Sequence, residues 1–232
     1  MTREEIGENL RTVRDRIAAA ATRAGREPGE VTLVVVTKTR PMDEVRAAIE
    51  AGATDLGENY VQELVAKAEG FGDSDVRWHA IGHLQTNKVR QVAPVVSLVH
   101  SLDSLRLAEE IDRRAAAAGR TIPALVQVNV AGEDSKFGVD EAGLMDLAPP
   151  VMQLQNVRLA GLMTMPPFVE EGEDNRLHFA RLRELRDGLT ALGIPADNLR
   201  ELSMGMTSDY EVAVEEGATL VRVGTAIFGP RQ

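Results

Sequence analysis

VTLVVVTK, at residues 31–38, is the stretch that constrains the fold most strongly. Its residues are apolar or β-branched up to Lys38, and turn-forming residues flank it, Pro28-Gly29 before and Pro41 after. A short apolar run between turn signals is typical of a strand that is buried on both faces. Strands of this kind occur in parallel sheets, whose two faces are covered by helices.

The same strand pattern recurs along the chain in alternation with helical patterns. Upstream, Ile6, Leu10, Val13 and Ile17 recur at helical spacing, which predicts an amphipathic helix that ends near Gly25. Downstream, apolar stretches alternate with helical ones as far as residue 224. We expect strands at 31–38, 53–59, 76–82, 95–102, 122–130, 157–165, 198–205 and 219–224, and helices at 41–52, 60–70, 87–94, 103–119, 139–154, 173–193 and 208–217.

Two positions bear on the helix ends. Asp103 is a candidate N-cap for the helix at 103–119, because its side chain can accept hydrogen bonds from the first turn. Pro149-Pro150 is expected to break the helix at 139–154, because proline lacks the N–H that the helix needs.

This alternation predicts the fold class. Alternating β and α elements indicate an α/β protein with a parallel sheet, and eight strands predict a closed (β/α)8 TIM barrel with one extra N-terminal helix. A doubly wound open sheet is the alternative, but it would usually carry a GxGxxG turn after the first strand, and that turn is absent. No linker divides the chain, so we expect one domain over residues 1–232.

Composition excludes several classes of function. The formal net charge of −10 argues against a nucleic-acid partner bound through a basic surface, although a local anion site needs only a few donors. The chain has no cysteine, which excludes disulfides, thiolate metal sites and cysteine nucleophiles and fits a cytoplasmic protein. It shows neither a secretory signal nor an apolar run near the roughly 20 residues that span a bilayer. The four histidines lack metal-site spacing.

The strand exits contain the candidate functional residues. In a barrel of this type the active site lies at the C-terminal ends of the strands. These exits are polar and rich in glycine, which a purely structural barrel would not need. They contain Lys38, Asn59, Lys88, Lys136 and Arg222.

Lys38 is the most informative of them. Strand alternation places Val34, Val36 and Lys38 on one face, and if that face points into the barrel the ammonium is partly desolvated. Desolvation favours the neutral amine, which is the form that condenses with an aldehyde. A lysine that only ends the strand and extends to water explains this context equally well.

Arg222, on the last strand, likewise has either a structural role or a role in binding a ligand. Leu220, Arg222 and Gly224 share a face, and an arginine that points inward needs an acceptor because an unpaired buried charge is costly. That acceptor is either an acid at the barrel rim or a ligand.

The last two strand exits together predict a phosphate site. They are SMGMTSD at 203–209 and VGTAIFG at 223–229. The loops after strands seven and eight are the frequent phosphate site of this barrel, and their Ser, Thr and Gly residues are typical of such a site. Ordinary turn and cap chemistry would also explain any one of them. The residues concerned are Ser203, Gly205, Thr207, Ser208, Gly224 and Thr225.

The remaining polar residues near the exits allow weaker predictions. We expect His79 and His83 to be hydrogen-bonded parts of the scaffold rather than catalytic groups. Glu58 and Asn59 are placed to meet the substituents of a ligand ring, while Lys88 and Lys136 either steer an anion or lie in solvent.

Taken together, these segments resemble the pyridoxal phosphate homeostasis proteins. The resemblance runs in order over nearly the whole chain, through VVVTKTRP, DLGENYVQE, WHAIGHLQTNK, VHSLDS, VNVAGEDSKFG, LAGLMTM, LSMGMTSDYEVAV and VRVGTAIFG. It implies a fold-type III barrel like the N-terminal domain of alanine racemase, with pyridoxal 5′-phosphate held by Lys38 as a Schiff base. It also implies that Ser203, Gly224 and Thr225 contact the phosphate, that Arg222 lies near the pyridine nitrogen, and that Asn59 and Met204 belong to the cofactor site.

An arginine beside the pyridine nitrogen affects the chemistry that the resemblance implies. Arginine does not readily give up a proton, so the ring nitrogen would stay unprotonated and the ring would be a weaker electron sink. This favours a carrier that buffers the cofactor and delivers it transiently to apoenzymes.

Two alternatives to a carrier stay open. A fold-type III racemase or decarboxylase would need acid and base groups on both sides of the substrate carbon, and Lys38 is the one we can name. Tyr60 and Tyr210 are the only tyrosines, and the absence of the β-domain of alanine racemase favours a monomer. The other alternative is a barrel for a different phosphate ligand, in which Lys38 supplies only charge.

Overall fold

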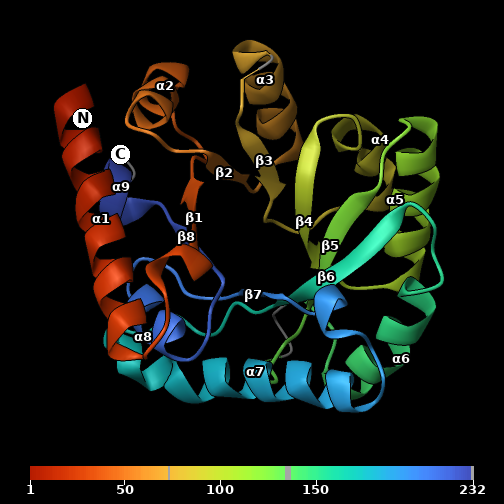
Figure 1. The fold of residues 1–232 in the computed structure, drawn as a ribbon. Coiled ribbons are helices and arrows are strands. Elements are labelled where there is room, and N and C mark those ends of the chain that lie inside the picture. The colour runs from red at the N-terminus through yellow and green to blue at the C-terminus, as the bar shows by residue number, and fades with distance from the viewer. Residues whose placement is uncertain (73, 134–136, 231–232) are drawn as a thin grey trace.

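Eight parallel strands close into a barrel in chain order, each strand pairing with the next and β8 pairing with β1 (Figure 1). The computed structural model describes the chain except for residues 73, 134–136 and 231–232. The predicted (β/α)8 barrel is therefore confirmed, and the open doubly wound sheet is excluded. The strands are β1 Thr32–Val36, β2 Asp55–Glu58, β3 Arg77–Ala80, β4 Val96–Leu102, β5 Ile122–Gln127, β6 Val157–Met163, β7 Glu201–Ser203 and β8 Leu220–Val223.

Helices surround the barrel, and each strand is followed by at least one helical turn. The last strand leads into a short helix, α9 Thr225–Phe228, which was not among the helices expected from the sequence. The α-helices are α1 Arg3–Arg23, α2 Met42–Glu50, α3 Val61–Phe71, α4 Val89–Val92, α5 Leu105–Ala117, α6 Glu141–Val151, α7 Arg176–Ala191, α8 Tyr210–Glu215 and α9 Thr225–Phe228. The described part of the chain also contains short 3-10 helices, η1 Pro28–Glu30, η2 Thr86–Lys88, η3 Gly172–Asn175 and η4 Ala196–Asn198.

The predicted N-terminal helix is α1. Thr2 and Glu5 form a capping box at its start, and its apolar stripe is buried against the side of the barrel next to α2, α8 and α9 (Figure 1). The stripe comprises Ile6, Leu10, Val13, Ile17, Ala20 and Ala21.

The apolar side chains form two layers. The larger one lies between the strands and the helices, and a smaller one fills the inside of the barrel. Val34 of β1 and Leu220 of β8 belong to the inner layer. Because side chains alternate along a strand, Lys38 and Arg222 continue the inward-facing rows that these two residues begin. The inner layer consists of Val34, Leu98, Leu125, Ala160, Met163 and Leu220.

Two predictions about helix ends were wrong. Ser104, not Asp103, caps α5, because the Ser104 side chain accepts the hydrogen bond from the Leu107 N–H. The helix α6 continues through Pro149 and Pro150 to Val151 instead of breaking there. Both prolines fall in its last turn, so the helix ends one residue after Pro150.

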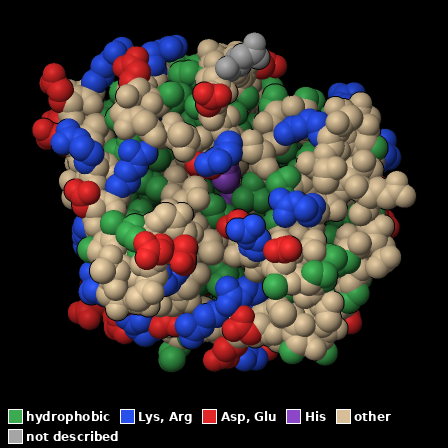
Figure 2. Space-filling view, in the orientation of Figure 1, with side chains coloured by type: hydrophobic (Ala, Val, Ile, Leu, Met, Phe, Trp, Pro, Cys, Tyr) green, Lys and Arg blue, Asp and Glu red, His purple; other side chains and the backbone are tan. Residues whose placement is uncertain are grey.

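On the face drawn in Figure 2, acidic and basic side chains are interspersed over the helices. This distribution is typical of helix faces exposed to solvent. Within the described ranges, every helix is too short or too polar to span a bilayer.

Candidate functional site

A cavity of about 530 Å³ opens among the C-terminal ends of the strands, where the sequence predicted the site. Residues from seven of the eight strand exits or strand ends contribute to its wall. The residues that line it are Val36, Lys38, Arg40, Asn59, Ile81, Gly82, His83, Gln127, Phe137, Met165, Phe168, Met206, Thr207, Ser208, Arg222, Gly224 and Thr225.

The charge of the cavity is opposite to that of the whole chain. Lys38, Arg40 and Arg222 line it, and none of its described lining residues is an aspartate or glutamate. The chain as a whole has a formal charge of −10. Cations concentrated in a concave site raise the local concentration of anions, so this cavity is suited to an anionic ligand.

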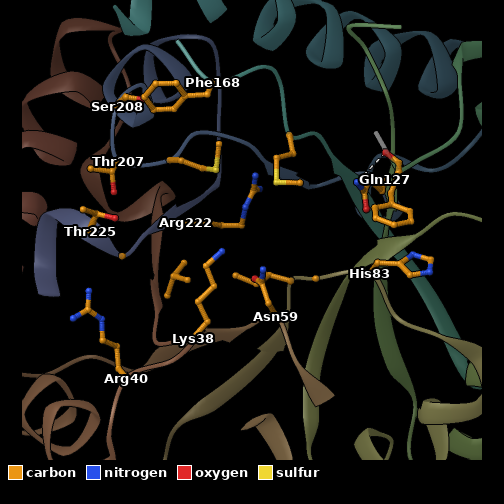
Figure 3. A pocket seen from close by; sticks show the side chains of 17 residues that line it. Lys38, Arg40, Asn59, His83, Gln127, Phe168, Thr207, Ser208, Arg222 and Thr225 are labelled. Carbon is orange, nitrogen blue, oxygen red and sulfur yellow. Dashed lines mark hydrogen bonds between the residues drawn. The ribbon is translucent and has the colours of Figure 1, made fainter. Parts of the chain in front are cut away.

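Polar groups of different chemistry occupy different parts of the cavity (Figure 3). Lys38 extends toward Arg222 near its centre. The hydroxyl residues Thr207, Ser208 and Thr225 gather on one side, and His83 and Gln127 lie on the other. The cavity can therefore hold an elongated ligand with an anionic group at its hydroxyl end and a reactive group at Lys38.

Lys38 lies in a tight turn directly after β1. The Thr37 N–H still donates to the Gly57 carbonyl as part of the sheet, and the Arg40 N–H donates back to the Thr37 carbonyl at 3.0 Å. Thr39 has a φ of +62°, in the left-handed region that threonine rarely adopts. The surrounding structure must therefore hold this turn in place.

A buried ionic cluster provides that hold. The Lys67 Nζ donates to the Thr37 carbonyl at 2.7 Å and to the Glu58 carboxylate at 2.6 Å, and it is 3.2 Å from the Glu63 carboxylate. Glu63 in turn accepts from the Thr39 N–H at 2.7 Å. Both sides of Lys38 in the chain are thus tied to α3 and β2.

Glu58 is part of this cluster and not of the cavity wall. Burial raises the pKa of Glu58 above its ordinary value, although the hydrogen bonds from Lys67 and Thr37 oppose the shift. The Thr37 hydroxyl donates to the same carboxylate oxygen at 2.6 Å. Glu58 therefore positions the turn of Lys38 and does not reach the cavity, whereas Asn59 does line the cavity.

Replacing Lys67 by methionine is expected to lower the free energy of unfolding by about 3 kcal/mol, because the buried Glu58 carboxylate loses its cation. Urea denaturation measures the change. The matched control is Glu63→Gln, which alters the more exposed partner of the same lysine and should cost less than about 1 kcal/mol. Equal losses in the two variants would contradict a dominant Glu58–Lys67 pair.

Arg222 is buried at the base of the cavity. Its guanidinium donates to the Ser203 hydroxyl at 2.6 Å and to the Thr164 carbonyl at 2.9 Å. Burial lowers the pKa of Arg222 to about 10, and the charge of Asp209 opposes this shift. The side chain is therefore still a cation at neutral pH, and its two acceptors among the described residues are neutral groups.

The loop after β7 brings two hydroxyls to the cavity. The Asp209 carboxylate accepts from the Met206 N–H at 2.6 Å and from the Asn175 side chain at 2.8 Å. Asn175 also donates to the Pro167 carbonyl, which ties the loop after β6 to the loop after β7. These bonds hold Thr207 and Ser208 at the cavity wall, on the same side as Thr225 of α9.

A family model described as "Alanine racemase, N-terminal domain" matches residues 8–232. A pyridoxal phosphate homeostasis protein of Aquifex aeolicus is 46% identical over 225 residues, which cover 97% of this chain and 98% of the relative. The chain belongs to the pyridoxal phosphate homeostasis family.

Solved structures of similar proteins agree with this family. A protein of Bifidobacterium adolescentis, described as unknown, superposes with a TM-score of 0.90 at 45% identity and covers 97% of this chain and 95% of its own. PipY of Synechococcus elongatus PCC7942, solved with PLP bound, superposes with a TM-score of 0.83 at 37% identity and covers 97% of this chain and 100% of its own.

Most of the residues that the family resemblance picked out lie on the cavity wall. They are Lys38, Asn59, Arg222, Gly224 and Thr225. Ser203 and Met204 do not line it. Ser203 faces the inside of the barrel below the cavity, between His100 and Arg222, whereas Met204 points outward into the core between strands and helices. The chain turns into the cavity only after them, so Thr207 and Ser208 supply the hydroxyls.

The side of the cavity opposite the hydroxyls carries an aromatic stack beside the polar side chain of Gln127. The His83 ring stacks on Phe137 with centroids 4.2 Å apart, and its Nδ1 lies 3.3 Å from the Asp103 carboxylate. Gln127 donates to the Phe137 carbonyl at 3.0 Å. His83 thus lines the cavity while its ring packs on Phe137, and the ring is turned away from Lys38 (Figure 3).

Several members of the site carried no signal in the sequence. Arg40, Met165 and Phe168 line the cavity, but a single arginine or apolar residue in a loop is not distinctive without the fold. Lys88 does not line it, and Lys136 lies outside the described residues. Among the described residues, no cluster of three or more His, Cys, Asp or Glu is placed to hold a metal ion.

Proposed function

We propose that this chain binds pyridoxal 5′-phosphate as a Schiff base with Lys38 and acts as an intracellular carrier that buffers and delivers the cofactor. The observation that carries the proposal is the cavity itself. Lys38 faces Arg222 within a wall that has three cations, no described acid and three hydroxyl residues at one end. The homeostasis proteins of the same family and the PLP-bound relative support it.

The hydroxyl end fits the phosphate of this cofactor. A phosphate monoester carries about 1.5 to 2 negative charges at neutral pH and offers three strong acceptor oxygens. Thr207, Ser208 and Thr225 supply hydroxyl donors, and Gly224 lets the chain approach closely. Arg40 adds a positive charge to the same cavity. Direct contact of the Ser203 or Met204 side chain with the phosphate is not part of the proposal, because both are fully buried outside the wall.

Arg222 is proposed to face the pyridine nitrogen. When bound, the cofactor supplies an electrophilic aldehyde and an electron-withdrawing ring. Arg222 keeps its own protons at neutral pH, so it donates a hydrogen bond without protonating the ring. This arrangement holds and orients the cofactor and leaves the ring a weak electron sink.

A carrier role is favoured over a racemase by what surrounds Lys38. Racemisation needs proton donors and acceptors on both faces of the substrate carbon. Tyr60 and Tyr210 are both outside the cavity wall, and the His83 ring is turned away from Lys38. We further propose that the chain is a single-domain cytoplasmic monomer and meets recipient apoenzymes only transiently.

Transfer and turnover measured on the same holo-protein test this proposal. We expect the holo-protein to restore activity to the apo form of a pyridoxal-phosphate enzyme, compared with a control that contains the apoenzyme alone. We expect racemisation and decarboxylation of common L-amino acids to stay well below roughly 1 s⁻¹. Turnover at or above that rate would establish an enzyme, and failure to reload the apoenzyme would rule out delivery.

A further inference from the structure

A chain of hydrogen bonds crosses the inside of the barrel and ends on Arg222. From the cavity downward, the Ser203 hydroxyl lies 2.6 Å from Arg222 Nη1 and 2.8 Å from His100 Nδ1. His100 Nε2 lies 2.9 Å from His79 Nδ1, and His79 Nε2 lies 3.0 Å from Asp55 Oδ1. All five residues are at least 96% buried.

The chain runs from one end of the barrel to the other. Asp55 and Arg77 are the first residues of β2 and β3, whereas Ser203 is the last residue of β7. Arg77 is largely exposed and pairs with both oxygens of Asp55, at 2.7 and 2.6 Å. The site at the C-terminal ends is thus connected to a surface ion pair at the opposite ends of the strands.

The two terminal residues fix the direction of every bond between them. Arg222 can only donate, and an ionised Asp55 can only accept. With neutral imidazoles, Ser203 then donates to His100, His100 donates to His79, and His79 donates to Asp55. Both histidines must carry their proton on Nε2. The geometry thus determines the two tautomers.

The local electrostatics agree with an ionised Asp55 and a neutral His100. Burial raises the pKa of Asp55, but the hydrogen bonds from His79 and Arg77 outweigh it, so the pKa lies below its ordinary value. Burial, with the nearby His79 and Arg222, lowers the pKa of His100 well below its ordinary value. Asp55 is therefore ionised and His100 neutral at neutral pH.

We propose that Asp55 is a positioning residue for Arg222. Its carboxylate fixes the tautomers of His79 and His100, so that the Ser203 hydroxyl proton points to His100 and its lone pairs face the guanidinium. Arg222 is thereby held at the base of the cavity in one orientation. The effect on the cofactor rests on the function proposed above, whereas the effect on the tautomers does not.

The variant Asp55→Asn removes the directing charge while keeping the size of the side chain. An asparagine can donate to His79 Nε2, which lets the chain of bonds reverse. His100 would then donate to Ser203, and the hydroxyl would receive two donors. The matched control is Arg77→Ala, which removes the exposed partner of Asp55 but leaves the carboxylate on His79.

Nitrogen-15 NMR of the histidines in the cofactor-free protein reads out the tautomers. We expect Nε2–H on both His79 and His100 in the wild type and in Arg77→Ala, and a shift to Nδ1–H in Asp55→Asn. Titration with pyridoxal phosphate should show a dissociation constant about tenfold higher in Asp55→Asn, which corresponds to one weakened hydrogen bond, and nearly unchanged in Arg77→Ala.

Each outcome either supports or overturns the positioning role of Asp55. Unchanged tautomers in Asp55→Asn, or equal changes in both variants, would overturn the positioning role. If Asp55→Asn does not fold, His79→Gln and His79→Leu replace it. The glutamine amide can accept from His100 and donate to Asp55, so His79→Gln should keep the wild-type tautomer of His100 and the wild-type affinity for pyridoxal phosphate. His79→Leu should lose both. Expected tautomers in a protein that binds no pyridoxal phosphate would leave the positioning intact and refute the proposed function instead.

Discussion

Lys38→Ala is expected to release pyridoxal 5′-phosphate that the wild type retains through gel filtration. The alanine variant lacks the amine that forms the covalent bond and also one of the cations of the cavity. Non-covalent contacts alone should raise the dissociation constant by about 100-fold or more, which equals about 2.8 kcal/mol. Absorbance of the protein fraction after gel filtration measures the retained cofactor.

Lys88→Ala is the matched control for this variant. Lys88 also follows a strand exit, but it does not line the cavity, so its loss should leave retention close to the wild-type value. If Lys38→Ala retained the cofactor as well as Lys88→Ala does, the covalent role of Lys38 would be wrong.

Gly161→Ala is expected to have the largest effect on stability. Gly161 of β6 has a φ of +148° and pairs with Glu201 of β7, and an added Cβ would overlap the Glu201 carbonyl oxygen. The strained backbone and the forced separation of β6 and β7 should together lower the free energy of unfolding by about 4 kcal/mol. Urea denaturation followed by circular dichroism measures the loss.

Gly188→Ala is the matched control, and the same substitution is expected to raise stability there. Gly188 lies within α7, and a Cβ there would meet no atom within 4 Å. Alanine should stabilise the helix by about 0.5 to 1 kcal/mol. If Gly161→Ala were as stable as Gly188→Ala, the close approach of β6 to β7 would not limit the fold.

The barrel could be predicted because its signals are local. Each strand and helix is recognisable from periodicity within a few residues, and the order of the elements determines the sheet. The period of two grouped Lys38 with Val34 and Val36, and Arg222 with Leu220 and Gly224, but whether either face points inward was open until the barrel closed around the cavity that both residues line. The helix ends were harder, since whether Asp103 or Ser104 caps α5 depends on a single hydrogen bond.

The environment of the site could not be predicted, because its partners are far apart in the chain. The sequence indicated that His79 belongs to the scaffold, but its bonds to Asp55 and His100 depend on barrel closure. Ser203 was expected at the phosphate because it opens the SMGMTSD segment. Its position as the last residue of β7 turns its side chain inward, toward His100 and Arg222.

Borohydride reduction of the holo-protein, followed by peptide mass spectrometry, tests whether Lys38 holds the cofactor as a Schiff base. Reduction makes a Schiff base permanent, so we expect one phosphopyridoxyl adduct per chain on the peptide that contains Lys38. An unmodified Lys38, with the adduct on another lysine or absent, would contradict a Schiff base at Lys38.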